Sequence, residues 1–250
     1  STGTLEIFEA PTGDGIRLDT GFQNKDTITR FYDPMLGKLI THGRTRDEAL
    51  KHMQQALRSY VLGGVKTNLP FLNTLMQQPA FSAAKLSTDF LIQYPVTLPP
   101  PLLETSLMFA AGITFLNHRP DKNNLFAQDT FAWQLQGQIT WPLYYALEDA
   151  RHAVYITPRS TQQFDYVHQN IKHTLKITQT QSRITLDTGE ERLSAYVRLH
   201  ANQIKIYTHT GETTLTQVPS LKQTTQKKKK KNSLNAPMPA TVVAVLKNRR

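Results

Sequence analysis

The sequence predicts an α+β protein in which mixed strands and helices precede an antiparallel β-barrel. Residues 1–93 alternate short strand patterns with amphipathic helix patterns. Residues 102–116 form a helix pattern that is apolar on every side, and eight short strand patterns separated by turn signals follow it. An all-apolar helix in a protein of ordinary polar composition has to be covered on all sides. We therefore expect the strands to close into a barrel around this central helix.

The first region contains three strand patterns and two helix patterns. The strands are "TLEIFE", "GIRLDTG" and "MLGKLITHG". The first helix begins at Thr45, and Glu48 three residues later completes a capping box. A second helix begins at Asn68, has Pro70 in its first turn, and is predicted to end before Pro79.

A proline-rich segment, "YPVTLPPP" at 94–101, separates this region from the apolar helix. The strand patterns that follow are "FAWQLQGQI", "HAVYITP", "FDYVHQ", "TLKITQT", "RITLDTG", "LSAYVRLH", "QIKIYTH" and "TTLTQV". Turns such as "DTGE" and "HTGE" separate them at intervals typical of a barrel or sandwich. The side chains facing the helix are expected to be small, unless the barrel is wide.

The net charge of +10 does not indicate a nucleic-acid-binding protein, because Lys227–Lys231 supply five of those charges. The alternative, a basic arm for phosphate backbones, lacks the interleaved aromatic residues that such a surface uses. The run is predicted to be a linker, and we expect no nucleic-acid and no membrane partner. The chain has no cysteine, which excludes disulfides, thiolate metal sites and a cysteine nucleophile. We see no signal peptide and expect a cytoplasmic protein, or one of the mitochondrial matrix if the source is eukaryotic.

Few residues form a catalytic pattern. There is no glycine-rich phosphate loop, and the eight histidines lack metal-ligand spacing. His168 and His173 are expected on the surface of strands, and Glu190 and Glu191 in a solvated hairpin turn. Arg17 is better placed, because it lies in a short strand beside Gly13 and Gly15, and its planar guanidinium suits a bicarbonate, carboxylate or enolate oxygen. The alternative for Arg17 is a surface ion pair with Asp19 or Asp14.

The segment "GDGIRLDTGFQNKDTITRFYDPMLGKLITHGRTRDEAL" resembles the C-terminal lobe of biotin carboxylase. The family pattern is G-x-G-[VI]-R-x-[DE], a spacer, then Y-D-P-M-[IL]-x-K-L-I-x-x-G and a capped R-[DE]-x-A helix. "GGVKTNLPFLNTLMQQPAF" and "STDFL" continue the resemblance, which covers residues 1–93. The spacer departs from the pattern, with Phe31 where many members have tyrosine.

The resemblance implies a ligase that uses ATP, with Mg²⁺ or Mn²⁺, to activate bicarbonate and transfer CO₂ to biotin. It implies that Arg17 is the catalytic residue that holds bicarbonate and steadies the biotin enolate, and that Phe90 lies near the adenine of ATP. The ATP-binding lysines, metal-binding glutamates and general base belong to an upstream lobe in this family. We therefore expect the chain to be an incomplete carboxylase that is inactive alone.

The rest of the sequence resembles the biotin-containing α subunit of acyl-CoA carboxylases, most closely the methylcrotonyl-CoA type. Residues 94–220 are similar to its middle (BT) domain, a helix-centred barrel that contacts the carboxyltransferase β subunit, and "LFAQDTFAWQLQGQ" resembles the motif after its helix. Residues 221–235 are the lysine-rich linker, and "APMPATVVAVL" within 236–250 resembles the first strand of the biotin carrier domain. The biotinyl lysine of the A-M-K-M motif would lie beyond residue 250.

The sequence thus predicts a fragment of a multisubunit acyl-CoA carboxylase, with the carboxyltransferase subunit, the carrier domain and other α subunits as partners. Two alternatives stay open. In the first, the chain is a non-catalytic assembly module that binds the carboxyltransferase. In the second, it belongs to a propionyl- or geranyl-CoA carboxylase.

Overall fold

The computed structural model describes residues 1–31, 33–100, 102–120, 131, 137–181 and 183–219. Ser1–Val218 form one compact unit, and Pro219–Arg250 form a second, of which only Pro219 is described. The predicted linker at 221–235 and the predicted carrier strand at 236–250 therefore lie outside the described residues. The same holds for most of the motif at 125–138.

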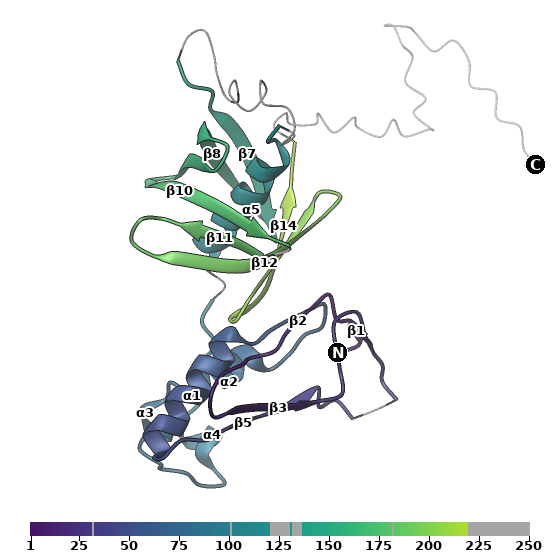
Figure 1. Cartoon of the computed structure of the whole chain (residues 1–250), viewed down its shortest axis with the longest axis vertical. Helices are drawn as coiled ribbons and strands as arrows, with labels where there is room; N and C mark the ends of the chain where they lie inside the picture. Colours follow the sequence, from purple (N-terminus) through teal and green to yellow (C-terminus); the bar gives the residue numbers. More distant parts are fainter. Residues whose placement is uncertain (32, 101, 121–130, 132–136, 182, 220–250) are drawn as a thin grey trace, which may run out of the picture. The chain divides into compact units, whose positions relative to one another are not determined.

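Residues 1–93 form three two-stranded antiparallel sheets and four helices (Figure 1). The strand pairs are β1 (Gly3–Thr4) with β4 (Thr27–Ile28), β2 (Ile7–Glu9) with β6 (Val61–Gly63), and β3 (Ile16–Thr20) with β5 (Gly37–Thr41). The helices are α1 (Arg46–Ser59), α2 (Leu69–Leu75), α3 (Pro79–Ser82) and α4 (Phe90–Gln93). We refer to residues 1–93 as the lobe.

The predicted start of helix α1 is confirmed. The Thr45 hydroxyl accepts a hydrogen bond from the Glu48 amide at 3.2 Å, and the Glu48 carboxylate accepts one from the Arg44 amide at 2.6 Å. The Thr45 hydroxyl thus satisfies an amide that the helix itself leaves unpaired, and Glu48 holds the residue before the N-cap. The second predicted helix ends at Leu75, and Pro79 starts the separate short helix α3.

Eight antiparallel strands close into a barrel in the order β10-β11-β12-β13-β14-β7-β8-β9. They are β7 (Trp141–Leu147), β8 (Ala150–Ser160), β9 (Gln163–His168), β10 (Ile171–Thr180), β11 (Arg183–Asp187), β12 (Arg192–His200), β13 (Gln203–Thr208) and β14 (Gly211–Gln217). Seven of the sequence patterns correspond to β8–β14. The first predicted strand, at 131–139, lies mostly outside the described residues. The sequence analysis missed β7, which begins at Trp141 and contains Pro142, a residue that argues against a strand interior.

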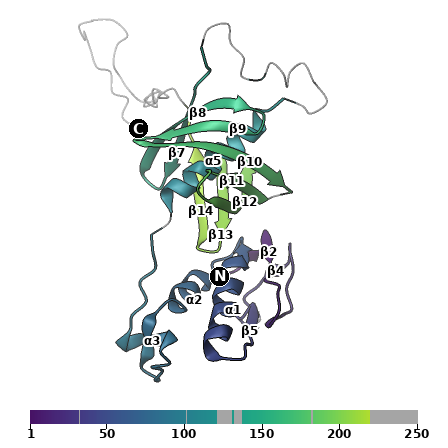
Figure 2. The ribbon, with the colours of Figure 1, turned by 60° about the vertical axis from the view of Figure 1, so that its left-hand side comes forward.

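Helix α5 (Leu103–Asn117) packs against the inward-facing residues of the barrel, and it lies against the barrel strands in both views (Figures 1 and 2). Every residue from Ser106 to Leu116 is buried. Small residues on the helix, Ala110, Ala111 and Gly112, permit this contact, whereas most inward strand residues are large. A Cβ atom at Gly112 would lie 2.9 Å from the Ile177 side chain, so the helix backbone and β10 are closely packed.

The lobe touches the barrel where β6 and the residues around Glu6 and Ile7 meet β13. Lys205 Nζ and Tyr207 Oη lie 2.9 Å and 2.7 Å from the two carboxylate oxygens of Glu6. Tyr207 is fully buried and forms an apolar cluster with Ile7 and Val61 of the lobe. No helix among the described residues is long and apolar enough to cross a membrane.

Candidate functional site

A tight turn presents Arg17 at the start of strand β3. Gly15 has a φ of +70°, a left-handed conformation that favours glycine. A Cβ atom there would lie 2.5 Å from the His42 carbonyl oxygen, which leaves no room for a side chain. The His42 amide donates to the Gly15 carbonyl at 2.8 Å and ties the turn to the end of β5. The glycine beside Arg17 is therefore required by the backbone.

The Arg17 side chain lies on the surface and is held by Asp19. Its exposed fraction is 74%, and its Nε and Nη2 atoms lie 2.7 Å and 3.1 Å from the two oxygens of the Asp19 carboxylate. The hydrogen bonds from Arg17 hold the pKa of Asp19 below its usual value, and the carboxylate raises the pKa of Arg17. Of the two interpretations of Arg17, the surface ion pair with Asp19 is present in this structure. Asp19 therefore holds the guanidinium along its Nε–Nη2 edge, and Nη1 has no hydrogen-bond partner among the described residues.

The ring of Phe90 is covered by its own lobe. Phe90 begins helix α4, is 7% exposed, and packs against Phe81 and Tyr94 at centroid distances of 6.0 Å and 5.1 Å. Arg46 lies over the Phe81 ring and donates to the Phe81 carbonyl. The predicted contact between Phe90 and adenine stays a prediction, because the packing seen here accounts for its burial.

The described residues do not form a metal centre: none of their histidine, aspartate and glutamate side chains gather in a group of three or more. The lobe presents the surface guanidinium of Arg17 on β3, which suits an oxyanion such as bicarbonate.

A second polar cluster, buried against helix α5, was missed by the sequence analysis. Glu104 accepts a hydrogen bond from the Tyr166 hydroxyl at 2.6 Å, and its other oxygen lies 2.7 Å from His168 Nδ1. Burial and the neighbouring carboxylate raise the pKa of Tyr166. The prediction that His168 is a surface residue was wrong, because its exposed fraction is only 4%. The available signal was Glu104 itself, since a charged residue in an apolar helix needs partners.

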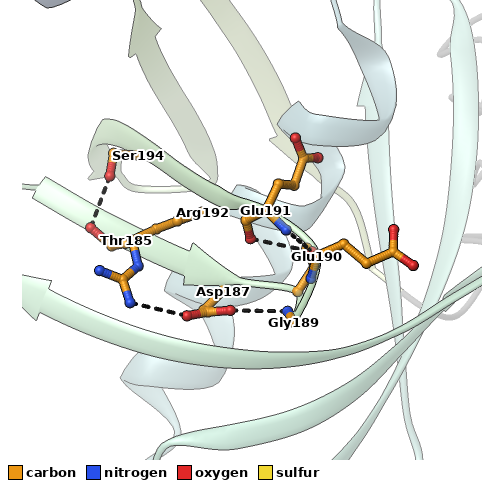
Figure 3. A network of polar contacts seen from close by, with 8 residues as sticks. Thr185, Asp187, Gly189, Glu190, Glu191, Arg192 and Ser194 are labelled. Atoms are coloured by element: carbon orange, nitrogen blue, oxygen red, sulfur yellow. Dashed lines mark hydrogen bonds and ion pairs between the residues drawn. The ribbon is translucent and has the colours of Figure 1, made fainter.

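The turn between β11 and β12 agrees with its prediction. Glu190 and Glu191 are exposed, and their amides donate to the Thr188 hydroxyl (Figure 3). Asp187 accepts from the Gly189 amide at 2.9 Å and pairs with Arg192 at 3.2 Å. The two glutamates therefore lie in a solvated hairpin turn, as expected.

Comparison with known proteins identifies relatives of the lobe. Residues 1–93 match the family described as the biotin carboxylase C-terminal domain. Over 94 residues the chain is 42% identical to "Biotin carboxylase 2" of Bacillus subtilis, which covers 38% of this chain and 21% of that protein. Over 120 residues it is 35% identical to the mitochondrial "Propionyl-CoA carboxylase alpha chain" of Caenorhabditis elegans, covering 45% and 17%.

A solved structure, the biotin carboxylase subunit of pyruvate carboxylase, is 39% identical with a TM-score of 0.37 and covers 38% of this chain and 21% of that one. The chain thus spans about a fifth of the length of the relatives it matches. Residues 1–93 are homologous to the biotin carboxylase C-terminal domain of biotin-dependent carboxylase subunits.

Proposed function

We propose that this chain is part of the biotin-containing α subunit of a biotin-dependent acyl-CoA carboxylase. The observation that carries the proposal is the match of residues 1–93 to the biotin carboxylase C-terminal domain, with Arg17 exposed on β3 in that domain. In the complete subunit ATP, with Mg²⁺ or Mn²⁺, supplies the energy that activates bicarbonate. Phe90 is the proposed contact for the adenine.

The proposed role of Arg17 is to hold bicarbonate and to stabilise the negative charge on the biotin ureido oxygen. Its guanidinium is permanently charged, and Asp19 fixes the fork from the Nε side. A preorganised cation of this kind stabilises developing charge without moving during the reaction. Nη1 has no partner in the part of the chain that the structure describes, so its N–H donors can bind an oxyanion.

Substitution of Arg17 tests this role. In the complete subunit, Arg17→Ala is expected to slow biotin carboxylation by about 100-fold or more, the size for removing a donor to a developing oxyanion. The melting temperature should hardly change, because the side chain is exposed. Arg44→Ala, which removes an exposed arginine of the same lobe, is the control and should leave the rate unchanged. An unchanged rate in Arg17→Ala would return Arg17 to a surface ion pair.

Residues 94–220 are proposed to be the BT domain, with α5 as its central helix, followed by a linker at 221–235 and the start of the biotin carrier at 236–250. The closed barrel and the burial of α5 support this assignment. Sheet edges and loops such as "NQIKIYTHTGE" are the proposed docking elements for the carboxyltransferase. The closed order of the barrel strands favours the loops and side chains over strand edges.

A pull-down distinguishes the proposed domains. The cognate carboxyltransferase subunit is expected to retain residues 94–225 and not residues 1–93. The reverse pattern would contradict the BT assignment. Retention of the full chain without any contribution to carboxylation in the reassembled enzyme would favour the alternative, a non-catalytic assembly module.

The proposed substrate is an acyl-CoA, with 3-methylcrotonyl-CoA as the sequence-based choice. Propionyl-CoA is a second candidate, favoured by the identity to propionyl-CoA carboxylase α chains over a longer stretch than the lobe alone. Carboxylation of each acyl-CoA by the reassembled enzyme decides between them.

A further inference from the structure

A cavity of about 380 Å³ lies where the proline linker, the first turns of α5 and the β13–β14 hairpin meet. This volume is within the range of small-molecule sites. Its apolar wall includes Pro100, Phe109, Leu193 and Ile206, and its polar wall includes side chains from α1, α5 and β12. The barrel and α5 residues that line this cavity all lie outside residues 1–93, the region matched to the biotin carboxylase family.

Helix α5 begins at this cavity without a cap. Leu102 occupies the N-cap position and provides no side-chain acceptor. The first intrahelical bond shown there runs from the Ser106 amide to the Leu102 carbonyl at 2.9 Å, and the amides of residues 103–105 have no partner among the described residues. The end of this fifteen-residue helix therefore presents free donors and a partial positive charge.

Ser106, in the first turns of α5, is a second polar group at this cavity. It is 5% exposed and lines the cavity, but its hydroxyl makes no hydrogen bond to any described residue. Thr114 on the same helix differs, since its hydroxyl lies within 2.9 Å of both the Ala110 carbonyl and the Tyr145 hydroxyl. The Ser106 oxygen is not among the fully buried atoms without a partner, so it keeps some exposure toward the cavity, where the hydroxyl can donate to a ligand oxygen.

Cationic side chains outnumber acidic ones around the cavity. Arg58 and Arg192 line it, and Glu212 is the one carboxylate that does. Arg58 makes no ion pair within the described part of the chain, whereas Arg192 reaches Asp187 in the β11–β12 turn (Figure 3). Burial and the charge of Arg58 lower the pKa of His209, which also lines the cavity. Glu104 is engaged by Tyr166 and His168 and does not line the cavity.

We propose that this cavity binds a small organic anion, with its oxyanion at the first turn of α5 and Ser106 and its apolar body against Phe109 and Ile206. The shared chemistry is a carboxylate or a phosphate monoester on a short hydrocarbon. Helix N-termini and arginines both bind such groups. The site is independent of the proposed carboxylase function, because it uses no residue of the Arg17 site.

The test is a titration of the full chain, labelled at isoleucine methyl groups, with butyrate, monobutyl phosphate and 1-butanol at constant ionic strength. The Ile206 signal is expected to shift in a saturable manner with at least one anion, while Ile177, which packs against Gly112, does not shift. Butyrate and monobutyl phosphate as separate arms show which oxyanion the site takes. Equal affinity for 1-butanol, or no saturable shift with either anion, would overturn the proposal.

Two variants locate the oxyanion. Ser106→Ala suits a helix and removes only the hydroxyl, and Arg58→Gln removes one charge from the rim. Each is expected to weaken anion binding by about tenfold, the size for a hydrogen bond to a charged group. Arg44→Gln, an exposed lobe arginine that does not line the cavity, is the matched control. A loss in either variant supports the site, and full affinity in both would overturn it.

Discussion

The lobe and the barrel bury their apolar side chains in different ways. The barrel and α5 share one continuous cluster, which includes Phe109, Phe164 and Tyr145. The lobe divides its apolar residues among smaller clusters, one around Leu57 and another around Leu5. A closed barrel has an inside that side chains can fill, whereas three separate two-stranded sheets enclose no common interior.

The lobe and the barrel also differ in how well their buried polar atoms are hydrogen-bonded. Among the described residues, the fully buried side-chain atoms without a hydrogen bond are Tyr60 Oη and Asn73 Oδ1, and both lie in the lobe. A cavity of about 610 Å³ lined by Tyr60, leucines and methionines lies there too, and Phe31 and Met35 are strongly exposed. The buried polar side chains of the barrel, such as Tyr145 and Tyr166, have partners. Among the described residues, the barrel thus pairs its fully buried polar atoms, whereas the lobe leaves two of them unpaired and has surface suited to further contacts.

The largest effect should come from emptying the barrel core. Phe109→Ala is expected to lower the free energy of unfolding by about 3–5 kcal/mol, the range for removing a packed aromatic ring. Phe109 is 1% exposed, whereas Tyr155 on β8 is 43% exposed, so Tyr155→Ala serves as the control with a much smaller effect. Urea denaturation followed by circular dichroism measures both. Equal losses in the two variants would show that α5 does not share the barrel core.

Two tyrosines test whether buried hydroxyls are hydrogen-bonded in the barrel and unpaired in the lobe. Tyr145→Phe removes a hydroxyl bonded to Thr114 and is expected to cost about 1 kcal/mol or more, because Thr114 loses a buried partner. Tyr60→Phe removes a hydroxyl without a partner and should be neutral or slightly stabilising. Thermal unfolding of the two variants in one buffer makes the comparison. A cost in Tyr60→Phe as large as that in Tyr145→Phe would mean that the lobe hydroxyl has a partner in solution.

The smallest effect concerns the contact between the two regions. The hydrogen bond from Lys205, assisted by Tyr207, lowers the pKa of Glu6 below its usual 4.5. The contribution of Glu6 to stability is therefore complete above pH 4.5 and is lost as the pH falls through the lowered value. Because the side chain is partly exposed, the contribution should stay below about 1 kcal/mol.

A comparison of wild type with Glu6→Gln between pH 6 and pH 3 measures this effect. The glutamine variant should be less stable at pH 6, and the difference should shrink on acidification. A difference that is constant across this range would show that the carboxylate of Glu6 does not contribute to the contact.

Much of the local structure followed from the sequence, because the groups that decide it are close along the chain. The capping box joins Thr45 and Glu48, and the turn before Arg17 needs Gly15 for its backbone conformation. Seven barrel strands were recognisable from alternation, while β7 was obscured by Pro142. The candidate Arg17 was also visible, through the family motif around it.

The tertiary structure alone decided which side chains meet across long separations. Glu104 and His168 are brought together by closure of the barrel around the start of α5, and nothing near either residue predicts that pairing. The sequence by itself determined the elements and the homology of residues 1–93, since propensity, capping and motif spacing are local properties. The cavity at Ser106, the ion pair of Arg17 and the contact of Glu6 with Tyr207 depend on three-dimensional packing, because a partner's position is set by the whole fold.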